Sequence, residues 1–165
     1  MKKGRRLKQI GIVLLVLLNI GCDQVSKDVV RKKVDFGEYI EIVPDHFILT
    51  NVENTGAMLG FGDDFSPWVK IIVLQLIPVL ILFVLLFRVL LKKTLTLWDG
   101  TAFSFVIGGG IGNLIDRIAY GSVTDFFQIR LGFLKTGIFN MADVSVTLGV
   151  LLLLALSLSG KKIVV

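Results

Sequence analysis

A 24-residue apolar run from Trp68 to Leu91 constrains this chain more than any other feature. An α-helix rises about 1.5 Å per residue, so the run can cross the roughly 30 Å hydrocarbon core of a bilayer. It therefore predicts a transmembrane helix. Pro78 removes one backbone hydrogen bond within it and predicts a kink rather than a break. The polar or helix-breaking interruptions are Lys70, Gln75, Pro78 and Arg88.

The composition of the whole chain agrees with a membrane protein. Of 165 residues, 54% are hydrophobic and 19% are charged, whereas about a quarter of the residues of a soluble domain are charged. The mean hydropathy is +0.80, which also excludes a disordered chain. Cys22 and His46 are the only cysteine and histidine, so neither a disulfide scaffold nor a zinc site is expected. The sequence predicts an integral membrane protein without a metal or other cofactor and without a nucleic-acid partner.

Three further apolar segments complete a predicted all-α bundle of four transmembrane helices in a single domain. The long first loop contains the alternating stretch Tyr39–Val43 and the β-branched stretch Phe47–Val52, separated by the turn signal Pro44-Asp45. We therefore expect a small extracytoplasmic β-sheet as well. The spans are expected at about 7–22, 68–91, 98–118 and 138–159, with outer loops at 23–67 and 119–137.

The first span is short, and its basic start followed by Gly21-Cys22 is also typical of a secretory signal with a lipoprotein cleavage site. In that alternative the chain is a lipid-anchored protein matured at Cys22. However, Asn19 stands where such sites normally have leucine, and three more spans follow. An uncleaved first helix is therefore the favoured interpretation.

The positions of lysine and arginine predict how the chain crosses the bilayer. Ten basic residues flank the spans on one side with Asp99 as the only acid, whereas acids accompany the basic residues of the two outer loops. By the positive-inside rule, both termini are expected in the cytoplasm. The ten residues are Lys2, Lys3, Arg5, Arg6, Lys8, Arg88, Lys92, Lys93, Lys161 and Lys162.

Polar residues inside or beside a span are costly and by default mark function. Here they form four clusters, all on the outer side of the membrane in the predicted topology. The clusters are Asp23-Gln24-x-x-Lys27, Asn54-Thr55-Gly56-Ala57, Gly112-Asn113-x-x-Asp116-Arg117 with Val123-Thr124-Asp125-Phe126, and Phe139-Asn140-Met141-Ala142-Asp143.

Some of these residues also have a purely structural interpretation. Asp23 and Lys27 are four residues apart, as in a surface ion pair of a helix, which contributes roughly a few tenths of a kcal/mol. Asp116 and Arg117 are equally well explained by pairing with other charges at the interface. Asp125, taken alone, is a plain loop acid.

The glycines of the third span favour close helix packing. Gly108-x-x-x-Gly112 is more typical of a packing face than of a ligand loop. A phosphate loop is excluded because the GxGxxG spacing fails and no Gly-Lys-Ser/Thr follows.

Asp143 is harder to explain structurally. If the fourth span begins near Ile138, the helical rise places this carboxylate about 7 Å inside the end of the span, on the same face as Asn140. An isolated ionised carboxylate is costly there, so it must be protonated, paired or wetted by a cavity. This favours a functional role.

The residue types present limit the available chemistry. His46 stands alone in the strand region, which excludes a Ser-His-Asp triad. Two carboxylates held close together share one proton near neutral pH. The ionised one accepts a proton from water while the protonated one donates a hydrogen bond to a substrate carbonyl. An aspartic endopeptidase is therefore favoured, and the alternative is a small carrier or proton-relay protein that uses Asp143, Asp116 and Arg117.

Five motifs in this order on a four-span chain resemble the lipoprotein signal peptidases (signal peptidase II). The resemblance runs from residue 23 to about 150, and it implies four transmembrane helices, a periplasmic β-cradle and an outer-face helix or loop over the active site. It also implies a reaction in the bacterial inner membrane: removal of the signal peptide of a prolipoprotein just before its diacylglyceryl-modified cysteine. The motifs are Asp23-Gln-x-x-Lys27, Asn54-x-Gly56-Ala57, Gly112-Asn113-x-x-Asp116-Arg117, Val123-x-Asp125-Phe126 and Phe139-Asn140-x-Ala142-Asp143.

The same resemblance makes Asp125 and Asp143 the catalytic pair. It implies a lipid-modified prolipoprotein as substrate, contact with membrane lipid and inhibition by globomycin-type cyclic peptides, and nothing demands more than a monomer. Thr124, Met141 and Met58 depart from the family pattern only at positions away from the pair. The supporting or substrate-binding residues it implies are Asn54, Gly56, Asn113, Asp116, Arg117, Asn140, Asp23 and Lys27.

Overall fold

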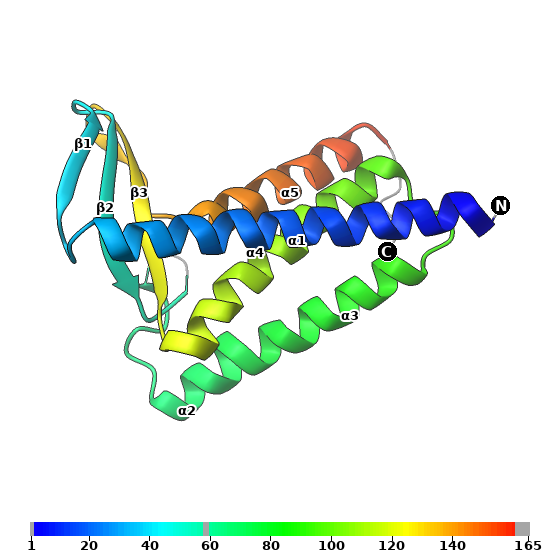
Figure 1. Ribbon diagram of the computed structural model, residues 1–165, viewed down its shortest axis with the longest axis horizontal. Coiled ribbons are helices and arrows are strands. Elements are labelled where there is room, and N and C mark those ends of the chain that lie inside the picture. Colours follow the sequence, from blue (N-terminus) through cyan, green and yellow to red (C-terminus); the bar gives the residue numbers. More distant parts are fainter. Residues whose placement is uncertain (1, 58–59, 161–165) are drawn as a thin grey trace.

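The computed structural model describes residues 2–57 and 60–160, without the side chains of Lys2 and Lys3. Met58, Lys161 and Lys162 lie outside the described residues. In the described part, four long helical segments run along one another and a small antiparallel sheet closes one end of the bundle (Figure 1). The helices are α1 (Lys2–Lys33), the continuous segment α2 (Pro67–Lys70), η2 (Ile71–Leu76) and α3 (Ile77–Leu91), then α4 (Leu97–Tyr120) and α5 (Met141–Leu158).

Three of these segments are long and apolar enough to cross a membrane, among the residues described: Gly4–Lys33, Pro67–Leu91 and Met141–Leu158. The more polar α4 packs against α1, α3 and α5. A helix surrounded by other helices meets protein rather than lipid, so glycine and serine replace the large apolar side chains that a lipid-facing helix needs. The predicted membrane bundle with a small sheet is confirmed, and the limits of the bilayer along each helix remain a prediction.

Two helix boundaries differ from the expected span boundaries. Helix α1 continues to Lys33, so the first part of the expected 23–67 loop is helical, because charged residues beyond the apolar stretch bind to α4. Helix α5 begins at Met141 rather than near residue 138, because Phe139 pairs with Phe127 of the sheet and Asn140 caps the helix. Asp143 therefore lies in the first turn of α5 and not deep inside it.

The segment α2–η2–α3 continues through Pro78 without a break, as expected. A short π-helical stretch, Ile71–Leu76, comes immediately before the proline. Proline cannot donate the backbone hydrogen bond that a regular helix requires, and irregular hydrogen bonding in the preceding turn accommodates that loss.

The sheet has the order β1-β2-β3-β4 and is antiparallel throughout. The predicted hairpin is confirmed by β1 (Tyr39–Val43) and β2 (Phe47–Asn54). The placement of Asp125 in a loop was wrong, because β3 (Val123–Leu131) pairs with β2 and carries this residue. The first four residues of β3 are all buried, so the strand lacks the alternation by which a half-exposed strand is recognised. The short β4 (Leu134–Lys135) completes the sheet.

Glycines allow close approach on two sides of α4. A Cβ atom at Gly108 would lie 2.7 Å from Cβ of Asn19, and one at Gly112 would lie 2.6 Å from Oδ2 of Asp23. The predicted Gly108-x-x-x-Gly112 packing face is therefore confirmed, and it faces α1. On the other side, Gly109 and Gly149 bring α4 against α5.

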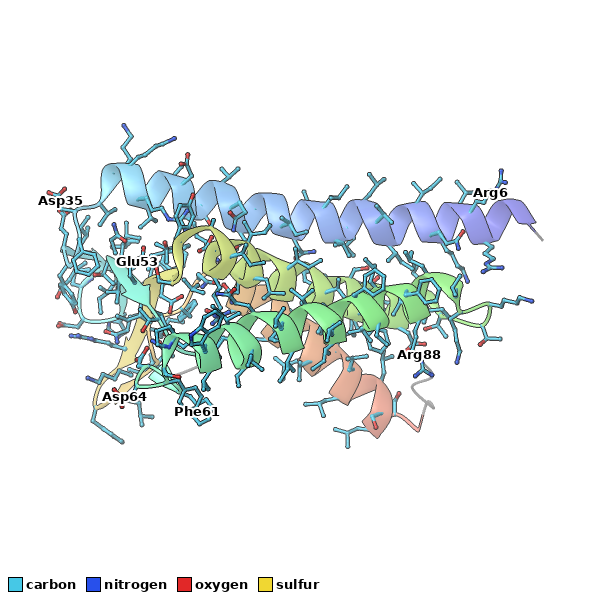
Figure 2. All side chains as sticks on the ribbon, turned by 90° about the horizontal axis from the view of Figure 1, so that it is seen from below. Arg6, Asp35, Glu53, Phe61, Asp64 and Arg88 are labelled. Carbon is cyan, nitrogen blue, oxygen red and sulfur yellow. The ribbon has the colours of Figure 1, made fainter. Side chains whose placement is uncertain are left out.

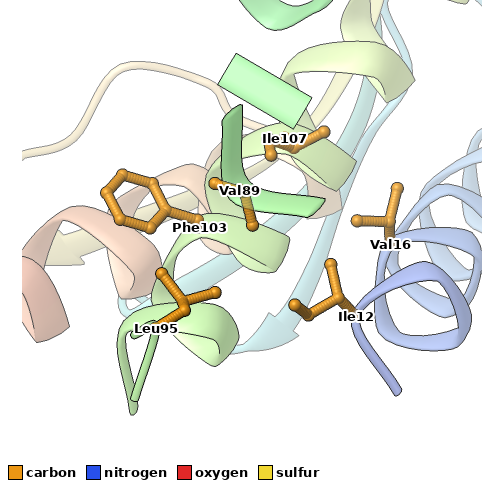
Figure 3. Packing of buried hydrophobic residues seen from close by; sticks show 6 residues of the cluster. All are labelled: Ile12, Val16, Val89, Leu95, Phe103 and Ile107. Carbon is orange, nitrogen blue, oxygen red and sulfur yellow. The ribbon is translucent and has the colours of Figure 1, made fainter. Parts of the chain in front are cut away.

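The bundle end remote from the sheet is held by an apolar cluster (Figure 3). It joins the first half of α1 to the end of α3, the α3–α4 connection and the first half of α4, so segments distant in sequence share one core. Its buried members are Ile12, Val16, Val89, Leu95, Phe103 and Ile107.

Replacing Gly149 with alanine is expected to destabilise the bundle. A Cβ there would lie 2.7 Å from the carbonyl oxygen of Ala102 and 2.9 Å from the backbone nitrogen of Val106, and such overpacking costs about 1–3 kcal/mol. Thermal unfolding in detergent tests this. Gly21→Ala is the control, because a Cβ at Gly21 has nothing within 4 Å; equal stability of the two variants would contradict the packing argument.

Candidate active site

The predicted site residues gather at the sheet end of the bundle. The end of α1, the end of α4, strands β2 and β3, and the start of α5 meet there (Figure 1). Figure 2 shows polar side chains crowded at this end, near the labelled Glu53, whereas Arg6 and Arg88 lie at the opposite end. The convergence of the four polar clusters, expected from the topology, is therefore present in the structure.

Asp125 lies on β3 opposite Val52 of β2 and is 5% exposed. Asn140 Nδ2 donates a hydrogen bond to its Oδ1 at 2.6 Å, and Asn54 Nδ2 donates to its Oδ2 at 3.0 Å. Burial raises the pKa of Asp125 to about 6, and the nearby charge of Asp143 adds to the increase, while the hydrogen bonds from Asn54 and Asn140 oppose it. Asp125 is therefore a carboxyl group that gains or loses a proton near neutral pH.

Asp143 is the third residue of α5 and forms a capping box with Asn140, the residue that caps this helix. The backbone N–H of Asp143 donates to Asn140 Oδ1 at 3.0 Å, and the backbone N–H of Asn140 donates to Asp143 Oδ2 at 3.1 Å. The other carboxylate oxygen, Oδ1, accepts from Asn113 Nδ2 at 2.9 Å. The carboxylate is thus fixed on both of its oxygens.

Asn140 links the two carboxylates directly. Its side-chain amide donates to Asp125, and its backbone amide donates to Asp143. The same side chain also donates to Asn113 Oδ1 at 3.1 Å. Both acids are therefore within hydrogen-bond reach of one fully buried residue, although they belong to a strand and to a helix.

A buried ion cluster supports this arrangement from the α1 side. Lys27 Nζ lies 2.8 Å from Asp23 Oδ2 and 3.2 Å from Asp116 Oδ2, and all three side chains are 0% exposed. The interpretation of Asp23 and Lys27 as a surface pair was wrong, because both are fully enclosed against α4. Asp116, in turn, pairs with Arg31 at 2.8 Å.

Lys27 also connects the ion cluster to the carboxylate pair. Its ammonium donates to Asn113 Oδ1 at 2.9 Å. This oxygen also accepts from Asn140, so the amide nitrogen of Asn113 must point the other way, toward Asp143. The ammonium thereby determines the orientation of the amide that holds the second acid.

Arg117 reaches across the site to the loop after β2. Its Nη2 donates to the carbonyl oxygen of Gly56 at 2.9 Å, and its own carbonyl oxygen accepts from Gln75 Nε2 at 3.1 Å. Its guanidinium is also close enough to Asp125 and Asp143 to interact with their charges. The predicted residues Asn54, Gly56 and Arg117 therefore join three segments around the two acids.

Four contributors to the site are absent from the expected supporting residues: Gln24 and Thr124 belonged to the predicted polar clusters without a role, and Arg31 and Glu53 were not singled out. Gln24 Nε2 bonds to Asp23, Asp116 and the carbonyl oxygen of Gly112. Thr124 Oγ1 accepts from Arg31 Nε at 2.8 Å and donates to Glu53 Oε1 at 2.8 Å. A signal for Arg31 was available, because it follows Lys27 by four residues, as Lys27 follows Asp23, and all three share one helix face.

No group of three or more histidine, cysteine, aspartate or glutamate side chains that could hold a metal ion occurs within residues 2–57 and 60–160. The carboxylates of Asp125 and Asp143 accept hydrogen bonds from side-chain and backbone amides, whereas Nε of Arg117 is buried without a hydrogen-bond partner. Fold and site together define a multi-pass helical membrane protein in which one asparagine, Asn140, holds two carboxylates at one end of the bundle.

Comparison with known proteins identifies the family. A family model described as Signal peptidase (SPase) II matches residues 15–159. A lipoprotein signal peptidase of Brevibacillus brevis is 36% identical over 150 residues, which cover 90% of this chain and 96% of the relative. One from Serratia marcescens is 30% identical over 159 residues, covering 96% and 91%. The chain belongs to the signal peptidase II family, as its sequence motifs indicated.

Solved structures agree with this assignment. A bacterial membrane enzyme determined by the in meso method at 2.3 Å resolution is similar with a TM-score of 0.78 and 29% identity, over 94% of each chain. A second bacterial membrane enzyme, at 1.9 Å, gives a TM-score of 0.75 over 90% of this chain and 92% of the other. The chain is therefore a multi-pass membrane peptidase with bacterial relatives.

Replacing Lys27 with methionine is expected to destabilise the fold by about 3–5 kcal/mol, because it leaves the buried carboxylate of Asp23 without a cation and that of Asp116 with Arg31 alone. Helix α1 offers a matched control in the exposed pair Asp28–Lys32, which has the same spacing and a 2.7 Å separation. Lys32→Met should change stability by less than about 1 kcal/mol. Thermal unfolding of both variants in detergent measures the difference. Similar losses of stability would show that burial of the ion pair does not determine its contribution to stability.

Proposed function

We propose that this protein removes signal peptides from diacylglyceryl-modified bacterial prolipoproteins, cleaving on the N-terminal side of the lipidated cysteine. Asp125 and Asp143 are the proposed catalytic pair. The observation that carries the proposal is Asn140, which donates one hydrogen bond to each acid and so holds both at one place. The family and the names of the relatives support the substrate class.

The environments of the two acids suggest different roles. Asp125 is buried and has a raised pKa, so it is the member that carries the proton. Asp143 is half-buried, so water reaches it more readily. In the proposed reaction, ionised Asp143 accepts a proton from water as the water oxygen attacks the scissile carbonyl carbon, and protonated Asp125 donates a hydrogen bond to the carbonyl oxygen. When the peptide bond breaks, Asp143 gives the proton that it took from water to the departing amine of the lipidated cysteine and is ionised again.

The supporting residues have proposed roles that follow from their contacts. Asn54, Asn113 and Asn140 orient the carboxylates by donating to them. Arg117 and Gly56 join the site to the loop that follows β2, where a substrate backbone would pass. Asp23, Lys27 and Asp116 act at a distance, through the buried cluster that fixes Asn113.

We propose that both termini lie in the cytoplasm and that the site faces the outer side of the bacterial inner membrane. Two of the basic residues that led to this prediction, Arg6 and Arg88, lie at the end of the bundle away from the sheet (Figure 2). The apolar signal helix of a substrate would lie in the bilayer beside the bundle. Its modified cysteine would emerge at the outer interface, level with the acids.

Asp125→Asn and Asp143→Asn are each expected to lower cleavage by about a hundredfold to ten-thousandfold, since each removes one proton-transfer group. The measurement is cleavage of a diacylated model prolipoprotein by the purified protein, with thermal unfolding to verify that each variant is folded. Asp28→Asn, in an exposed ion pair on α1, is the control and should keep full activity. Activity close to wild type in either dyad variant would contradict the mechanism, and globomycin should inhibit the wild-type reaction.

The raised pKa of Asp125 gives a pH dependence with a definite sign. Because the protonated form is the active one, kcat/KM should fall as pH rises through about 6. Asn54→Ala removes a hydrogen bond that lowers this pKa, so the fall should move to higher pH. Thr55→Ala is the control, since Thr55 bonds to Asp63 and Lys70 and not to either acid. A profile that does not move in Asn54→Ala would contradict the role of Asp125.

A further inference from the structure

A cavity of about 640 Å³ lies at the end of the bundle opposite the candidate active site. It is bounded by the start of α1, the end of α3 and the connection between α3 and α4, which lie at the end away from the sheet (Figure 1). Its size is that of a site for a small molecule. None of the proposed catalytic or supporting residues is part of its described lining.

The lining of this cavity is strongly basic. Arg5, Lys8, Lys92 and Lys93 contribute to it, and its described lining contains no aspartate or glutamate. The nearby Asp99 is buried and accepts a hydrogen bond from Thr96 Oγ1 at 2.7 Å. Four positive charges therefore surround a space without an opposing carboxylate in its wall.

Two of these cations bind only backbone oxygens among the described contacts. Arg5 Nη2 donates to the carbonyl oxygen of Leu91 at 3.1 Å, while its Nε is buried without a hydrogen-bond partner. Lys8 Nζ donates weakly to the carbonyl oxygen of Leu95 at 3.3 Å. An unsatisfied buried donor on a charged group is costly, and an anionic oxygen is the acceptor that would satisfy it.

Apart from the glycines and the uncharged polar residues Gln9, Thr96, Thr101 and Ser104, the rest of the lining is aliphatic. Ile12, Leu15 and Val89 form part of the wall. A second cavity of about 290 Å³ adjoins the first, because Gln9 and Leu90 line both. The other residues of this second cavity are aliphatic: Ile10, Val13 and Leu14. A basic cavity next to an aliphatic one, here called the aliphatic groove, is suited to an amphiphile with an anionic headgroup.

We propose that an anionic glycerophospholipid of the bilayer binds here, with its phosphate among Arg5, Lys8, Lys92 and Lys93 and an acyl chain along the groove of α1. Basic pockets between transmembrane helices are suited to anionic headgroups. The four positive charges would repel the basic N-terminus of a signal peptide, so the cavity is not suited to binding that end of the proposed substrate. A bound lipid would strengthen the junction between α1 and the end of α3, which Arg5 and Gln9 join through single hydrogen bonds to the carbonyl oxygens of Leu91 and Leu90.

The test compares binding of phosphatidylglycerol and phosphatidylcholine with identical acyl chains to the purified full-length protein, by native mass spectrometry. The triple variant Arg5→Gln, Lys8→Gln, Lys92→Gln should lose the preference for phosphatidylglycerol by about tenfold or more. The control is Arg6→Gln, Lys32→Gln, Lys33→Gln, which removes the same charge from residues outside the cavity. Equal binding of the two lipids to the wild type, or an equal loss in the control, would overturn the proposal.

Two further measurements separate a lipid from a free anion and guard against misfolding of the triple variant. Inorganic phosphate at millimolar concentration should not displace phosphatidylglycerol, and displacement would show that the cavity takes a phosphate ion rather than a lipid. Val13→Trp fills the aliphatic groove from a position that is 40% exposed, so the fold should tolerate it. This variant should weaken phosphatidylglycerol binding, and unchanged binding would overturn the placement of the acyl chain.

Discussion

The ammonium group of Lys27 is the interaction on which the rest of the site depends. It is fully buried, binds the carboxylates of Asp23 and Asp116 and donates to Asn113. A buried cation is tolerated only where opposite charges and hydrogen bonds enclose it, so α1 and α4 must meet at this point. Ala142 N–H also donates to Asp23 Oδ1 at 2.9 Å, which brings the start of α5 to the same place. One lysine thus holds three helices together beneath the sheet.

From this cluster a chain of side-chain amides extends to the two acids. Lys27 orients the amide of Asn113 by donating to its oxygen. Asn113 in turn donates to Asp143, and Asn140, which also donates to Asn113, donates to Asp125. Neutral amides fix the carboxylate oxygens without forming an ion pair with them, and the nearby guanidinium of Arg117 donates to the carbonyl oxygen of Gly56. A lysine in direct contact would keep both acids ionised. The separation of cation from acids by one amide therefore preserves a carboxyl group that can hold a proton.

Much of this arrangement could be predicted from the sequence. Apolar runs located the helices, alternation located the β1–β2 hairpin, and the density of polar residues beside the spans located the site. Three features could not be predicted, since they depend on tertiary contacts. The first is strand β3, whose start is buried and shows no alternation. The second is the extension of α1, which depends on contacts of Asp23, Lys27 and Arg31 with α4 and the sheet. The third is the burial of the Asp23–Lys27 pair, because the spacing of two charged residues does not show whether they are exposed.

The capping box that begins α5 ties catalysis to the architecture of this helix. The carboxylate of Asp143 closes the first turn by accepting from Asn140 N–H, and its negative charge lies at the positive end of the helix dipole. In the proposed mechanism this same carboxylate takes up a proton in every catalytic cycle. Each cycle would then briefly weaken the capping interaction at the N-terminus of a membrane-spanning helix. Any change that alters the reactivity of this acid would therefore also alter the stability of the first turn of α5.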